Sequence, residues 1–130
     1  MPTPITPSAA LPTNVDRQAL FYLFVTALEG GIGYWSAASA YRWALPTGEP
    51  DLDGFYAVVE ETEEDAPVAH RIDADTILRG LVHFSQPGED YPHVREVARA
   101  ILSGDYEVDY DSEDVDCIVQ AALLGEVVYG

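Results

Sequence analysis

Hydrophobic and polar positions along the chain follow two different periods, one typical of helices and one typical of strands. Apolar residues recur every three or four positions in residues 15–29, 74–84, 92–102 and 115–124, which we predict to be helices. Alternation with a period of two predicts strands at residues 34–45, 55–62 and 68–72. Together the segments predict an α+β fold, in which a small three-stranded antiparallel sheet packs against about four helices.

The predicted helices carry local start and stop signals. The expected N-terminal caps are Asn14 for the first helix, Asp73 for the second, and Asp111 or Ser112 for the last. Asp114 lies three residues beyond Asp111, as in a capping box. Pro92 fits the first position of its helix, and Gly125 is expected to end the last one.

Other segments have a weaker pattern. Residues 1–13 contain four prolines and are expected to form a flexible arm before a single domain at residues 14–130. The alanines within residues 34–45 would also tolerate a helix. Residues 126–129 are a candidate edge strand, which could pair with a second copy in a homodimer.

The charge of the chain restricts the partners that it can bind. Its 130 residues carry 23 acids and six bases, all arginine, for a net charge of −17. Such a surface repels nucleic acid and acidic membranes, because both require cations, whereas it attracts basic proteins. Cys117 is the single cysteine, so no intrachain disulfide forms. Since neither a secretory signal nor a membrane span is apparent, we expect a cytoplasmic protein.

Three glycines within four residues make residues 29–35 the least ordinary stretch of the chain. The run lacks the order of strand, glycine-rich turn and helix that dinucleotide binding requires. We expect a helix stop followed by a turn, with a ligand-lined turn as the alternative.

Two stretches of the chain resemble small uncharacterised proteins encoded by phages of actinobacteria. They are residues 29–35 (EGGIGYW) and residues 114–130 (DVDCIVQAALLGEVVYG). The resemblance implies a small protein that acts in the cytoplasm of an infected bacterium, and it implies no activity and no functional residues.

Acids alternate with larger apolar residues in the last quarter of the chain. In an extended backbone, Tyr106, Val108 and Tyr110 would face the core while the acids at the odd positions between 105 and 111 share one exposed face. Other acids cluster after the second predicted strand. The candidate partner-binding residues are Glu60, Glu61, Glu63, Glu64, Asp65, Asp105, Glu107, Asp109, Asp111, Glu113, Asp114 and Asp116.

Other chemistry has weaker support in the sequence. Residues 105–116 place acids at most ligand positions of a calcium loop, but Tyr110 stands where that loop requires glycine, and we predict no metal site. The histidines are dispersed and no nucleophile motif is present, so we predict neither catalytic residues nor a cofactor.

Two function hypotheses follow. The first is a non-enzymatic, phage-type inhibitor or decoy, which presents a DNA-like acidic surface to a basic host protein that itself binds nucleic acid in defence, repair or transcription. The second is a protein that sequesters a nucleotide-like molecule in an aromatic and glycine-lined pocket. The candidate pocket residues are Glu29, Gly30, Gly31, Tyr34, Trp35, Tyr41 and Trp43.

Overall fold

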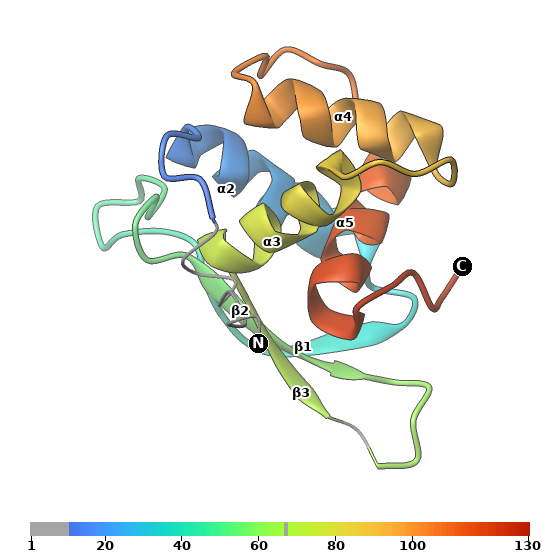
Figure 1. Cartoon of the computed structure of the whole chain (residues 1–130). Helices are drawn as coiled ribbons and strands as arrows, with labels where there is room; N and C mark the ends of the chain where they lie inside the picture. Colours follow the sequence, from blue (N-terminus) through green and yellow to red (C-terminus); the bar gives the residue numbers. More distant parts are fainter. Residues whose placement is uncertain (1–10, 67) are drawn as a thin grey trace, which may run out of the picture.

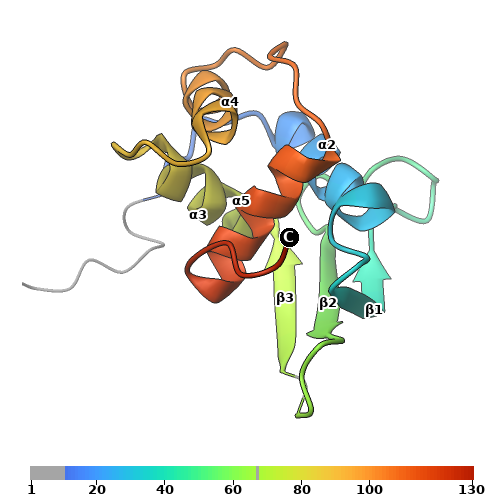
Figure 2. The same ribbon diagram turned by 90° about the vertical axis from the view of Figure 1, so that its right-hand side faces the viewer.

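A computed structural model describes residues 11–66 and 68–130 of the chain, in which the helices lie over one face and one end of a three-stranded sheet (Figures 1 and 2). Most of the predicted flexible arm therefore lies outside the described residues. Leu11, which we had included in that arm, packs partly buried against the core. The elements in chain order are α2 (Arg17–Thr26), η1 (Ala27–Gly31), β1 (Ser36–Arg42), β2 (Tyr56–Glu61), β3 (Ala69–Asp73), α3 (Ala74–Ser85), α4 (Pro92–Leu102) and α5 (Ser112–Leu124).

The predicted α+β class and the antiparallel sheet are confirmed, with strand order β1-β2-β3. Ala57 of β2 pairs with Tyr41 of β1 and with Ile72 of β3, and the side chains of Ala57 and Ile72 are fully buried beneath the helices. The ladder between β1 and β2 is irregular between Ala38 and Ala40, where one extra residue interrupts the register.

The first helix differs from the prediction at both ends. Asp16 caps it in place of Asn14, and the Asp16 carboxylate accepts the N–H of Gln18 at 3.0 Å. At its end the helix widens into the π-helical turn η1 instead of stopping at the glycines. Gly31 is the last residue of that turn, and the start of α5 lies close to it. Glycine suits this position because a Cβ would lie 3.1 Å from the carbonyl oxygen of Ser112.

The later helices follow their local signals. Asp73 caps α3 in a capping box with Thr76, and Asp111 caps α5 in the box expected with Asp114. Pro92 is the first residue of α4. Gly125 ends α5 in the left-handed conformation, at φ 85°.

Helices α3 and α5 cross in the centre of the core, where the backbone of α5 touches α3 at Gly80. A Cβ on Gly80 would lie 2.2 Å from the carbonyl oxygen of Ile118, which is a backbone atom that cannot rotate away. The side chains around this crossing are fully buried, namely Ile77, Leu81 and Ile118. Glycine at this position therefore sets the distance between the two helices.

We predict that Gly80→Ala lowers the free energy of unfolding by about 1–3 kcal/mol, because the helices must separate to admit the methyl group. Urea denaturation measures the change. Gly33→Ala is the matched control, since a Cβ at Gly33 meets nothing within 4 Å. Equal stability of the two variants would contradict the close crossing.

Candidate functional site

Residues 105–113 form an acidic segment that runs from the end of α4 into the first turn of α5. We define the acidic ridge as Asp105, Glu107, Asp109, Asp111 and Glu113, all of which are exposed. The segment is irregular, with a turn at residues 106–107, and is not the regular extended row that the alternation suggested. The backbone therefore does not space these carboxylates evenly.

The residues between these acids attach the segment to the body of the protein. Val108 and Tyr110 pack partly buried against the core, as the alternation predicted, whereas Tyr106, which was also expected to face the core, is exposed. The Tyr106 hydroxyl accepts the backbone N–H of Asp16 at 3.0 Å, just before α2. The acidic ridge is thus fixed beside the start of α2.

No described arginine or histidine lies within ion-pair distance of the acidic ridge. Four of the six arginines pair with acids elsewhere, as Arg17–Asp53, Arg42–Asp51, Arg71–Asp73 and Arg95–Asp90. Arg99 donates to the carbonyl oxygens of Ser85 and Gln86. The charge of the ridge is consequently left for solvent or for a partner.

Besides Asp111, which caps α5, two further candidate partner-binding acids are engaged within the protein. Asp114 is buried, closes the α5 capping box and lies 3.0 Å from His93, whose pKa it raises mainly through this hydrogen bond. Glu61 accepts the Tyr129 hydroxyl at 2.6 Å and lies 2.9 Å from His70, and the hydrogen bond with His70 is the main cause that lowers the pKa of Glu61. These carboxylates are unavailable to a partner.

Asp116, a third candidate, is the centre of a buried polar network. Its carboxylate accepts three hydrogen bonds, from Trp35 Nε1 at 2.8 Å, from the Tyr34 hydroxyl at 2.5 Å and from Gln120 Nε2 at 2.9 Å. Neutral donors thus replace the water that burial removes from this charge. Nothing in the local sequence around Asp116 indicated this role, because Trp35 is 81 residues away.

Gln120 extends the same network to the C-terminal residues. Its side-chain oxygen accepts the backbone N–H groups of Val128 and Tyr129 at 2.8 and 2.7 Å, and its nitrogen donates to the Tyr129 carbonyl oxygen at 3.1 Å. The Tyr129 ring stacks on Trp35, with centroids 5.2 Å apart. The edge strand expected at residues 126–129 does not form. The Gln120 side chain, and not a neighbouring strand, makes the hydrogen bonds to the backbone of Val128 and Tyr129.

The remaining candidate acids lie at the other end of the molecule. Glu60, Glu63, Glu64 and Asp65 are exposed on and after β2. Both views place the β2–β3 connection at the opposite end from the connection between α4 and α5 (Figures 1 and 2). The predicted acids therefore form two separate surfaces.

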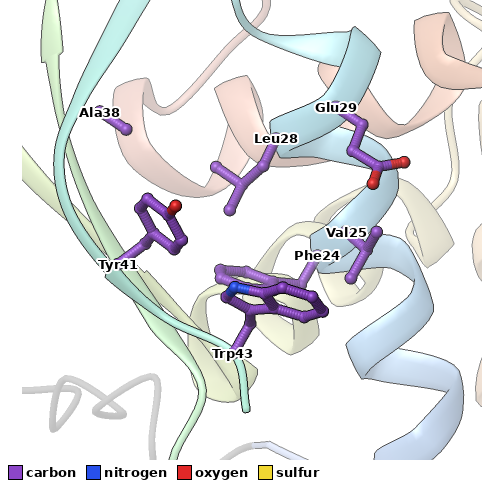
Figure 3. Close-up of a pocket in the computed structure, with 7 residues that line it drawn as sticks. All are labelled: Phe24, Val25, Leu28, Glu29, Ala38, Tyr41 and Trp43. Carbon is purple, nitrogen blue, oxygen red and sulfur yellow. The ribbon is translucent and has the colours of Figure 1, made fainter. Parts of the chain in front are cut away.

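The residues proposed for the alternative pocket are divided between two cavities. The first cavity, of about 340 Å³, takes in Glu29, Tyr41 and Trp43 (Figure 3). The second, of about 640 Å³, takes in Gly30, Gly31 and Tyr34 beside Asp116. Trp35 is fully buried and lines neither cavity.

The single thiol and the potential metal ligands were also located in the structure. Burial, together with neighbouring acids, raises the pKa of Cys117 to about 11, so this group stays a neutral thiol near neutral pH. Within residues 11–66 and 68–130, no group of three or more potential ligands is placed to hold a metal ion. The oxygens of Asp116, the last position of the calcium-like pattern, are already hydrogen-bonded inside the protein.

In the part of the chain that the structure describes, none of the helices combines the length and apolar character needed to cross a membrane.

Comparisons with protein-family models, with curated proteins and with solved structures gave no match to this chain. The site must therefore be interpreted from its own geometry.

We predict that Asp116→Ala lowers the free energy of unfolding by about 2–4 kcal/mol. The buried Trp35 N–H then loses its acceptor, and the Gln120 amide loses one of its acceptors. Thermal unfolding measures the loss, and faster proteolysis near residue 129 should accompany it. Asp109→Ala is the control, since Asp109 is an exposed acid of the ridge. If both variants unfold alike, the network does not stabilise the fold.

The network also predicts a loss of stability in alkali. Burial and the bond to Asp116 raise the pKa of Tyr34 to about 12, and the bond to Glu61 raises that of Tyr129 to about 12, from an ordinary value of 10.0. Between about pH 10 and about pH 12, these two phenols lose their protons in the unfolded chain and keep them in the folded protein. Their contribution to stability is therefore complete below pH 10 and is lost as the pH rises toward 12.

Ultraviolet titration of the phenols should show this late ionisation. Tyr129→Phe should remove one late-titrating group, and Glu61→Gln should shift that group to lower pH. An unchanged curve in both variants would refute the assignment to Tyr129.

Proposed function

We propose that this protein is a non-enzymatic binding protein that presents its acidic ridge to the cationic surface of a protein partner. The observation that carries the proposal is the fixed position of the ridge: its acids are exposed and have no described ion-pair partner, while Tyr106 and Tyr110 attach the segment to the body. An attached segment loses less conformational entropy on binding than a free one.

The partner class follows from charge. A net charge of −17 speeds the approach of a basic protein and opposes that of nucleic acid. Protein surfaces that bind DNA carry positive charge, because they neutralise phosphates. In this proposal the protein is an inhibitor or decoy of such a protein, in the manner of a phage product in the cytoplasm of its bacterial host.

The ridge resembles a DNA strand in charge and not in regular spacing. Its irregular backbone does not reproduce the constant phosphate repeat. We therefore expect it to compete with DNA for a basic surface without copying the helix geometry. A homodimer through residues 127–129 gains no support, because Gln120 already binds the backbone N–H groups of Val128 and Tyr129.

The proposal predicts that neutralising the ridge abolishes binding to basic proteins of an actinobacterial lysate. The test variant is Asp105→Asn/Glu107→Gln/Asp109→Asn, which removes three charges. Its control, Glu63→Gln/Glu64→Gln/Asp65→Asn, removes three charges at the opposite end. Capture on the immobilised protein is compared at about 0.05 M and about 0.5 M salt, since exposed charges are screened at the higher value.

The native protein and the control variant Glu63→Gln/Glu64→Gln/Asp65→Asn should retain nucleic-acid-binding proteins at low salt only. Duplex DNA should displace these proteins. The ridge variant should retain none. Capture that survives high salt, resists competing DNA or persists in the ridge variant would exclude the proposal.

A further inference from the structure

A second surface feature, which we call the aromatic groove, lies between the helix-facing side of β1 and the end of α2 (Figure 3). Its volume is about 340 Å³, and its walls are Phe24, Val25, Leu28, Glu29, Ala38, Tyr41 and Trp43. Tyr41 pairs with Ala57, which is fully buried on the helix-facing side of the sheet. Yet Tyr41 and Trp43 are 61% and 51% exposed, so this side of β1 is left partly uncovered.

The charged side chain that lines the groove is an acid. Glu29 is the only ionisable acid or base among its lining residues other than the Tyr41 phenol. Arg42 is the next residue after Tyr41 but pairs with Tyr56 in the ladder and contacts Asp51 at 3.0 Å. No described cation of this chain therefore occupies the groove, and the net charge of −17 favours a cation from outside.

We propose that the aromatic groove accepts the side chain of an arginine presented by a protein partner. A guanidinium is planar and weakly hydrated, and it stacks on aromatic faces such as the indole of Trp43. Its fork of N–H donors matches the Glu29 carboxylate, and its methylene stem packs on apolar walls such as Leu28. Lysine fits less well because its ammonium is compact and strongly hydrated.

Helix α2 connects the aromatic groove to the acidic ridge. Val25 of α2 lines the groove, while Tyr22 lines a small cavity of about 170 Å³ together with Tyr106 and Tyr110 of the acidic segment. Tyr22 is 53% exposed. The ten residues of α2 span about 15 Å, so one basic segment of a partner could contact both surfaces.

The partner class in this inference rests on the proposed function, but occupancy of the groove can be measured without that partner. The probe is the tripeptide acetyl-Gly-Arg-Gly-amide, and the signal is tryptophan fluorescence. Trp35 is fully buried and Trp43 is half-exposed, so a ligand in the groove changes the emission of Trp43. The same peptide with citrulline in place of arginine keeps the shape and removes the charge.

We expect saturable binding of the arginine peptide, and binding at least about tenfold weaker for the citrulline and lysine peptides. Glu29→Gln and Tyr41→Ala should each weaken the arginine peptide by about tenfold or more, and both positions are exposed, so the fold should persist. Glu63→Gln, at the far end, is the charge-matched control and should leave binding unchanged.

Equal binding of arginine and citrulline peptides, or equal loss in Glu29→Gln and Glu63→Gln, would overturn the groove assignment. Loss of peptide binding in the ridge variant Asp105→Asn/Glu107→Gln/Asp109→Asn would overturn it as well, since the charge alone would then explain binding. Those results leave the proposed function standing. Conversely, capture of basic proteins by the ridge variant would contradict the proposed function only. It would not bear on peptide binding in the groove.

Discussion

The buried carboxylate of Asp116 is the constraint on which the rest of the structure depends. Among the described residues it has no cationic partner, and the Trp35 indole, the Tyr34 hydroxyl and the Gln120 amide donate to it. A buried charge is costly unless such donors are complete. Through them α5 fixes the turn that leads into β1, and through Gln120 it fixes the C-terminal residues. Asp116 thus links α5 to the residues just before β1, and Gln120 links α5 to the C-terminal residues.

Five of the six arginines contact acceptors within the protein. Arg95 is buried and donates to the carbonyl oxygens of Gln86 and Asp90 and to the Asp90 carboxylate, which organises the connection before α4. Gly88 lies against this guanidinium, which leaves no room for a Cβ. Within residues 11–66 and 68–130, no arginine or histidine forms an ion pair with the acidic ridge. The core must outweigh the resulting self-repulsion.

Local signals in the sequence predicted local structure well, whereas long-range contacts were not accessible to them. The caps Asp73 and Asp111 were predictable because a capping box lies within four residues. The choice between Asn14 and Asp16 was not, since both are good caps. Glu61 and Asp116 bind donors that are distant in the sequence, and a carboxylate in a sequence looks the same whether it faces solvent or Trp35. For the same reason Tyr41 and Trp43 were predicted on one strand, which in the structure ends at Arg42, while the cavity that they share with Phe24 and Val25 of α2 was not predicted.

The irregular register of β1 between Ala38 and Ala40 has a consequence for self-association. β1 is an edge strand rich in small uncharged side chains, the type of edge that invites a neighbouring molecule to add a strand. The extra residue breaks the straight row of free peptide groups, so a second copy finds no continuous template there. Within the described residues, β1 thus combines an edge position beside the aromatic side chains with an irregularity that disfavours strand addition.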